Sequence, residues 1–207
     1  MARVLELGTL EDDDAAGAAA ATALQRGELV ILPTDTLYAL ACRAHDELAI
    51  GRVRRAKGRD QQKPLPLVAA DPGQLASLVD VAAAQRLVSS FWPGPLTLVL
   101  PAKAGVSDAI TSGLGSVAVR VPAHAFLRRL CRQVGPLVST SANRSGEPAP
   151  SSCAQAVSSM GEHVALAVDG GTGRTAPSTI VDMSGPEPRL VRTGVVPWAD
   201  VLRVLRP

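Results

Sequence analysis

Aromatic residues are scarce in this sequence, and only 2% of its 207 residues are Phe, Trp or Tyr. Modules that bind single-stranded nucleic acid stack bases on aromatic side chains, so this scarcity argues against that class. The formal net charge is only +2 at pH 7, which is too small for broad binding to polyanions. We therefore expect weak or no direct binding of tRNA or other nucleic acid.

Cysteine is also scarce: Cys42, Cys131 and Cys153 lie far apart and show no CxxC spacing. This pattern argues against a zinc site and fits a reducing compartment. No apolar run approaches the ~18 residues of a membrane span, and the N-terminal residues show no signal-peptide pattern. The expectation is a soluble, cytoplasmic protein without a membrane partner.

Several catalytic motifs are missing from the sequence. It contains no GxxxxGK[ST] phosphate loop, no GxGxxG after a strand and no GxSxG nucleophile elbow. The three histidines, His45, His124 and His163, show no metal-ligand spacing and are expected to be solvated or to cap helices. The sequence therefore predicts neither a metal cage made by the protein nor a covalent nucleophile.

The hydrophobic residues that are present, 46% of the chain, are enough for a sizeable core, and the length suggests one domain over residues 1–207. Helices are predicted at 13–26, 47–57, 82–91, 124–134, 151–160 and 198–205, and another begins at Asp71-Pro72. Strands are predicted at 29–32, 66–70, 92–101 (after a tight turn), 116–122, 136–141, 164–171, 178–183 and 189–194. This pattern predicts an α/β fold, and the successive strands near 164–194 predict a mixed sheet with antiparallel parts.

Two apolar strands end in clusters of polar residues. Leu29–Leu32 runs into Pro33, Thr34, Asp35 and Thr36, and PLV runs into STSAN at 139–143. A capped turn would explain the first cluster, because Thr and Asp satisfy free backbone groups. Ligands of open α/β sheets also bind at the carboxyl ends of strands, so a binding site is the alternative.

Cations stand near these strand ends. Lys57, Arg59 and Lys63 fall within seven residues, where they either bind phosphate oxygens or form a solvated basic face. Arg120 lies inside the apolar strand VAVRV and needs a partner there, which is either a structural acid or a ligand carboxylate. Ser178 opens another strand, and Arg192 precedes Thr193-Gly194. Together these residues indicate one pocket for an anionic ligand.

The segments PTDTLYAL, KGR with the following KPL, WPGPLTLVL, VAVRVP, STSANRSGEP, STIVD and a later RTG occur in this order. In this order the sequence resembles the YrdC-like family, the L-threonylcarbamoyladenylate synthases, over residues 13 to 195. The resemblance implies a twisted mixed sheet flanked by helices, with a large concave cavity, in the short single-domain form. It also implies condensation of L-threonine, bicarbonate and ATP into threonylcarbamoyl-AMP, with release of pyrophosphate.

The resemblance also assigns roles by position. Lys57, Arg59 and Thr36 become the catalytic candidates. The implied ATP-binding residues are Arg59, Lys63, Ser116, Ser139, Ser141, Asn143 and Arg192. The implied threonine-binding residues are Thr34, Thr36, Arg120 and Ser178. The only implied cofactor is Mg2+, bound mainly through the ATP phosphates, and the product feeds a downstream tRNA-modifying threonylcarbamoyl transferase complex.

Three positions depart from the family pattern. Ala39 replaces a usual glycine, which would cost about 1 kcal/mol if the position required a positive φ. Pro66 stands where a β-branched residue is usual. Ala69 stands where some members of the family have a histidine near the threonine. Two alternatives stay open: a related enzyme that forms a carbamoyl adenylate from another carbamoyl donor, and a non-catalytic RNA-binding protein.

Overall fold

The computed structural model of the chain describes residues 2–58, 64–173 and 176–206. Its strands are β1 (Arg3–Glu6), β2 (Val30–Leu32), β3 (Ala39–Arg43), β4 (Leu67–Val68), β5 (Leu96–Pro101), β6 (Ser116–Arg120), β7 (Leu137–Ser141), β8 (Leu166–Asp169), β9 (Thr179–Asp182) and β10 (Arg189–Arg192). Its helices are α1 (Leu10–Gln25), α2 (Glu47–Lys57), α3 (Gln85–Phe91), α4 (Asp108–Thr111), α5 (Ala125–Val134), α6 (Cys153–Met160) and α7 (Trp198–Leu205). Among these described helices, none combines the length and apolar composition needed to cross a membrane.

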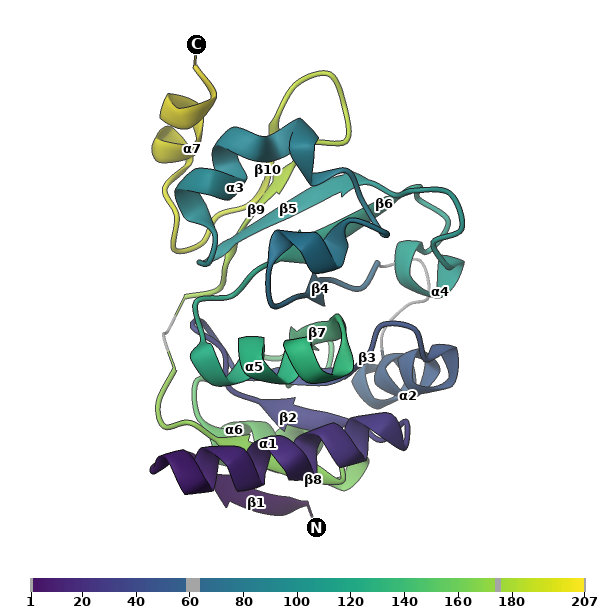
Figure 1. Cartoon of the computed structure of the whole chain (residues 1–207), viewed down its shortest axis with the longest axis vertical. Coiled ribbons are helices and arrows are strands. Elements are labelled where there is room, and N and C mark those ends of the chain that lie inside the picture. The colour runs from purple at the N-terminus through teal and green to yellow at the C-terminus, as the bar shows by residue number, and fades with distance from the viewer. Residues whose placement is uncertain (1, 59–63, 174–175, 207) are drawn as a thin grey trace.

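Within the described residues, all the strands join one sheet in the order β1-β8-β2-β3-β7-β4-β6-β5-β9-β10 (Figure 1). The pairs β1–β8, β2–β8, β4–β6 and β5–β9 are parallel, whereas β2–β3, β3–β7, β4–β7, β5–β6 and β9–β10 are antiparallel. The predicted mixed α/β sheet is therefore confirmed. The large concave cavity stays a prediction.

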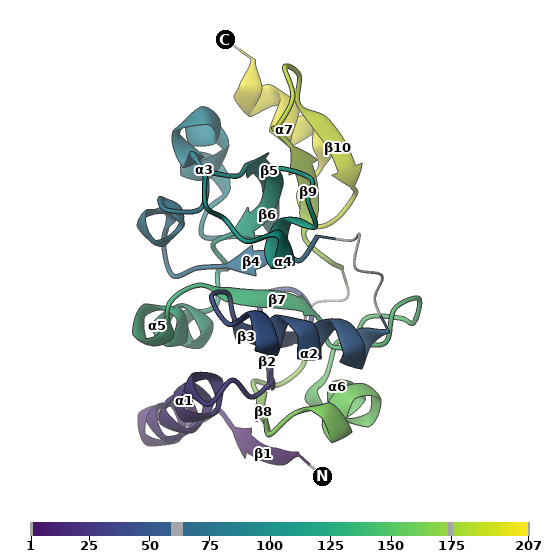
Figure 2. The same ribbon diagram turned by 90° about the vertical axis from the view of Figure 1, so that its right-hand side faces the viewer.

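The described helices cover both faces of this sheet, and the buried apolar residues form two core clusters. Helices α1 and α5 pack side by side on one face, and α2 and α6 lie on the other (Figure 2). One core cluster joins α1 and α5 to the sheet through small and medium side chains, for example Ala20, Leu24 and Leu130 against Val30. These buried side chains fix β2, and with it the polar segment that follows β2.

Several element predictions were wrong in detail. The strand predicted at 66–70 has only Leu67 and Val68 in the ladder, and the helix predicted after Asp71 is a single 3-10 turn, Pro72–Leu75. After this turn, Val79 forms an isolated antiparallel bridge with Ala102. The helix predicted at 82–91 begins as a 3-10 turn, Val81–Ala84, and becomes α3 only afterwards.

The predicted strands near 164–194 are correct as strands but are not all neighbours. β8 inserts between β1 and β2, whereas β9 and β10 lie at the opposite edge of the sheet, as Figure 1 shows. Three elements that no prediction contained are β1, β3 and the short α4. β3 reads ALACR, which lacks β-branched residues, and it is held as a strand by β2 and β7 on either side.

Candidate active site

The polar segment after β2 forms a capped turn whose hydroxyl groups are connected. The Thr36 backbone N–H donates to Thr34 Oγ1 over 3.0 Å, and Thr34 Oγ1 donates to the Leu37 carbonyl over 2.7 Å. The two threonine hydroxyls are 3.0 Å apart. Since the Thr34 proton points to Leu37, the Thr36 hydroxyl donates to Thr34 and can accept from another group. The capped-turn interpretation is thus confirmed, and the turn also joins a larger network.

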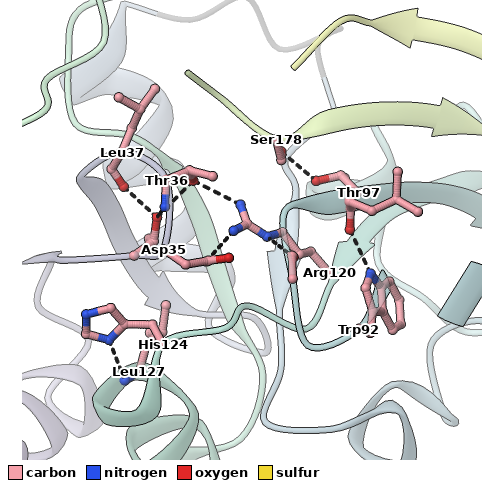
Figure 3. A network of polar contacts seen from close by, with 12 residues as sticks. Asp35, Thr36, Leu37, Trp92, Thr97, Arg120, His124, Leu127 and Ser178 are labelled. Carbon is pink, nitrogen blue, oxygen red and sulfur yellow. Dashed lines mark hydrogen bonds and ion pairs between the residues drawn. The ribbon is translucent and has the colours of Figure 1, made fainter. Parts of the chain in front are cut away.

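Arg120 is the centre of that network (Figure 3). Its side chain leaves the end of β6, is only 7% exposed, and forms an ion pair with Asp35. Its Nη1 donates to Thr36 Oγ1 over 3.0 Å and its Nε donates to the Gly94 carbonyl over 2.9 Å. Burial lowers the pKa of Arg120, and the Asp35 carboxylate opposes that shift. The structural partner predicted as one alternative for Arg120 is therefore Asp35.

A tight turn places the Gly94 carbonyl against Arg120. The Trp92–Pro93 peptide bond in this turn is cis, and the Trp92 indole N–H donates to the Leu96 carbonyl over 2.7 Å. A Cβ atom at residue 94 would lie 2.3 Å from the Phe91 carbonyl oxygen, so the turn requires glycine. The WPGP sequence thus fixes a backbone acceptor for the buried guanidinium.

Ser178, Thr97 and Arg192 form a second group of polar residues. The hydroxyls of Ser178 and Thr97 are 2.8 Å apart, and Arg192 Nη2 donates to the Ser178 carbonyl over 2.8 Å and to its hydroxyl over 3.1 Å. Burial lowers the pKa of Arg192, whose charge in turn contributes to the lowered pKa of Arg120. The two cations are therefore close enough to influence each other, which links this group to Arg120.

Lys57 organises a third group. It is the last residue of α2 and only 3% exposed, and its Nζ donates to the carbonyls of Ser141 and Asn143 over 2.5 Å and 2.6 Å. The Asn143 amide nitrogen donates to the Glu147 carbonyl over 2.7 Å, which shapes the start of the 144–152 loop. A solvated basic face is therefore the wrong interpretation for Lys57, which instead holds the STSAN segment in place.

The structure thus brings most of the predicted residues into three groups. The groups are Thr34, Thr36 and Arg120; Ser178 and Arg192; and Lys57, Ser141 and Asn143. Ser116 begins β6 and Ser139 lies in β7, and in the described part of the chain neither side chain is hydrogen-bonded to these groups. Arg59 and Lys63 lie outside the described residues.

Three contributors were missing from the predicted site: the Asp35 carboxylate, the Thr97 hydroxyl and the Gly94 carbonyl. The signals for the first two were present, since Asp35 lies inside PTDT and Thr97 is a polar residue in an apolar strand. Prediction placed the site at strand carboxyl ends and at the start of the strand that Ser178 opens, and the structure adds the amino end of β5. Ala39 has no positive φ, so the cost considered for it does not arise.

The described residues contain no group of three or more His, Cys, Asp or Glu side chains that could hold a metal ion. What they do contain is a set of buried cations among hydroxyl and amide groups. A mixed α/β sheet with such groups at its strand ends is a fold suited to a small anionic ligand.

Comparison with known proteins identifies the family. A family model for Sua5, YciO and YrdC, described as "Telomere recombination", matches residues 22–194. The threonylcarbamoyl-AMP synthase of Idiomarina loihiensis is 39% identical over 170 residues, covering 79% of this chain and 91% of its own length. That of Bacillus subtilis is 36% identical over 203 residues, covering 96% of this chain and 59% of the relative. The chain belongs to the Sua5/YciO/YrdC family.

The fold agrees with this assignment. The crystal structure of P. abyssi Sua5 complexed with L-threonine superimposes with a TM-score of 0.91 at 35% identity, covering 99% of this chain. This chain spans 61% of that longer chain.

Proposed function

We propose that this chain is a threonylcarbamoyl-AMP synthase, a nucleotidyltransferase that condenses L-threonine, bicarbonate and ATP and releases pyrophosphate. The observation that carries the proposal is the 39% identity to a relative of that name, which this chain matches over 91% of the relative's length. The threonine complex of P. abyssi Sua5, on the same fold, supports threonine as the amino-acid substrate.

The groups of site residues can be divided between the two larger substrates, L-threonine and ATP. L-Threonine would lie near Thr34, Thr36, Arg120 and Ser178, where a buried guanidinium can take a carboxylate through parallel bonds. ATP would lie near Ser141, Asn143 and Arg192, with Lys57 as the support for the first two. The remaining proposed ATP residues are Arg59, Lys63, Ser116 and Ser139.

In the proposed reaction no covalent bond forms between the protein and a substrate. The threonine ammonium first loses a proton to solvent. The free amine then attacks the carbon of bicarbonate, or of CO2 derived from it, to give a carbamate with net release of one water. A carbamate oxygen then attacks the α-phosphorus of ATP. Pyrophosphate leaves, and the new anhydride joins the carbamate to AMP. Arg59 is proposed to offset charge on the reacting groups and Thr36 to hold them through its hydroxyl, while Lys57 holds the segment that carries Ser141 and Asn143. Positioning and electrostatic stabilisation then supply the rate.

Mg2+ is proposed as the cofactor, carried mainly by the ATP phosphates and water. Mg2+ commonly binds in this manner, with few protein ligands and several retained waters. When bound, it would offset phosphate charge.

A pyrophosphate-release assay tests the proposed function. The purified chain with ATP and Mg2+ is expected to release pyrophosphate only when both L-threonine and bicarbonate are present. Release without threonine would favour an enzyme that uses another carbamoyl donor. No release under any of these conditions would favour a non-catalytic protein.

We further propose that the chain works in the cytoplasm and passes its product to a tRNA-modifying threonylcarbamoyl transferase complex. Direct tRNA binding should be weak, because the net charge is only +2 and aromatic residues make up only 2% of the chain. A salt titration of tRNA binding measures this. Submicromolar affinity at physiological salt would contradict it.

A further inference from the structure

Asp35 is a largely buried acid, and only one of its two carboxylate oxygens is hydrogen-bonded in the described part of the chain. Its side chain is 11% exposed, and its Oδ1 pairs with Arg120. Its Oδ2 is buried and accepts no hydrogen bond from the described part of the chain. A buried carboxylate oxygen without a donor is costly, so such an atom at a site is a natural acceptor for a ligand donor.

Arg120 also retains unused capacity beside Asp35. A guanidinium carries five N–H groups. In the described chain, Arg120 uses its Nε–H for Gly94, one Nη1–H for Thr36 and one Nη2–H for Asp35. One N–H therefore remains on each terminal nitrogen, and such a pair can serve the two oxygens of a ligand carboxylate.

The two side chains together have the charges that complement an α-amino acid. The Asp35–Arg120 pair carries one negative and one positive charge in a buried setting. The zwitterion of an α-amino acid carries the opposite pair, an ammonium and a carboxylate on one carbon. A site that bound only the carboxylate would leave the ammonium charge unpaired after desolvation.

We propose that Asp35 binds the α-ammonium group of the substrate through its Oδ2 atom, while Arg120 binds the substrate carboxylate. The inference rests on the proposed function, because it takes L-threonine as the substrate. Asp35 then selects amino acids over hydroxy or keto acids and fixes the nitrogen that becomes the carbamate. The ion pair in the free protein keeps both side chains aligned for the ligand.

Two ligands and three variants test this role by calorimetry. L-Threonine has both charged groups, whereas 3-hydroxybutyrate keeps the carboxylate and hydroxyl and lacks the amine. Asp35→Asn is expected to weaken threonine binding by roughly 10- to 100-fold, as the loss of a charge-assisted bond implies. The same variant should change 3-hydroxybutyrate binding by less than roughly 3-fold.

Asp182→Asn is the matched control, since Asp182 also pairs with an arginine over 2.8 Å, and that partner, Arg189, is an exposed residue of the edge strand β10. It should change neither affinity. Asp35→Glu keeps the charge but moves the acceptor oxygen, and it should also weaken the binding of threonine more than that of 3-hydroxybutyrate. If Asp35→Asn does not fold, Asp35→Glu still tests the proposal.

Each other outcome contradicts the proposal. An equal loss for both ligands would mean that Asp35 only supports Arg120. Tighter binding of both would mean that Asp35 competes with the ligand carboxylate. If the wild-type protein binds no threonine, the proposed function itself fails, and this inference fails with it.

Discussion

At the scale of single residues, the site is built from charges that are buried and individually partnered. A buried cation without partners would cost more free energy than most single interactions supply, so each must be surrounded by acceptors. Arg120 has a carboxylate, a hydroxyl and a carbonyl, and Lys57 has two carbonyls. These partners hold the side chains in one orientation before any ligand binds, which lowers the ordering cost of binding.

Arg120→Lys is expected to raise the threonine concentration needed for half-saturation by roughly 10- to 100-fold while leaving ATP affinity nearly unchanged. Lysine keeps the charge but loses the planar fork that takes a carboxylate through two bonds. Calorimetry with each ligand and a melting curve on the same preparation measure the effect.

The control for this change is Arg129→Lys, which alters an exposed ion pair with Asp13. A purely structural Arg120 would lower the melting temperature and both affinities together. Wild-type threonine affinity in the Arg120→Lys protein would remove this residue from the site.

Lys57→Met should lower the free energy of unfolding by about 2–5 kcal/mol and weaken ATP binding. Methionine matches the length of the lysine stem but leaves the carbonyls of Ser141 and Asn143 without this donor. Urea unfolding and ATP titration measure the two effects. Lys103→Met is the control, because Lys103 donates to the Ala76 carbonyl at an exposed position. Equal effects of Lys57→Met and Lys103→Met would mean that Lys57 contributes no more than an exposed lysine does.

At the scale of elements, the strand ends are set by close backbone contacts that only glycine allows. A Cβ atom at Gly194 would lie 2.3 Å from the Pro177 carbonyl oxygen and 2.4 Å from the Ser178 carbonyl carbon. The RTG segment at the end of β10 is therefore in close contact with the start of β9, where Ser178 contacts Arg192. The glycine of this motif serves packing between two elements.

Gly194→Ala is expected to destabilise the protein by about 1–3 kcal/mol or more, because backbone atoms cannot yield as a flexible side chain can. Gly185→Ala provides a matched control in the β9–β10 turn, where an added Cβ meets nothing within 4 Å. The control should stay within about 0.5 kcal/mol of the wild type. Equal stability of the two variants in urea unfolding would contradict the described contact.

His124 shows how the start of α5 makes stability depend on pH. Its ring caps the helix by accepting from the Leu127 N–H at 3.4 Å, which confirms the predicted capping role. Burial lowers its pKa from 6.5, and Arg129 adds to this shift, whereas Asp35 and Asp13 oppose it. Below 6.5 the unfolded chain therefore binds a proton that the folded chain resists, and stability falls as the pH falls.

His124→Asn keeps a good helix cap and removes this titration. Between about pH 7.5 and about pH 5.5, the wild type should lose more unfolding free energy than the variant, measured in urea. Parallel losses would mean that His124 does not contribute to the acid sensitivity.

At the scale of the whole molecule, the sequence alone could predict most of the elements but not which strands are neighbours in the sheet. Strands with β-branched runs, such as β2 and β6, were predictable, whereas β1 and β3 exist because other strands pair with them. The place of β8 between β1 and β2 is equally non-local.

The same limit applies to the site. The polar segments after β2 and β7 and the buried Arg120 were recognisable in the sequence. The partner of Arg120 was not, because Asp35 lies 85 residues earlier in the chain and only the folded sheet brings the two together. The burial of Lys57 could not be predicted either. Lys57 belongs to a charged segment, and nothing in the sequence distinguishes it from its charged neighbours.

The most direct test of the account is mass spectrometry of the reaction product made with carbon-13-labelled bicarbonate. The protein, ATP, Mg2+, L-threonine and the label should give a nucleotide that contains AMP, threonine and one labelled carbon. Arg120→Lys should form less of it at limiting threonine. ATP consumption without a nucleotide that contains both threonine and the label would contradict the account.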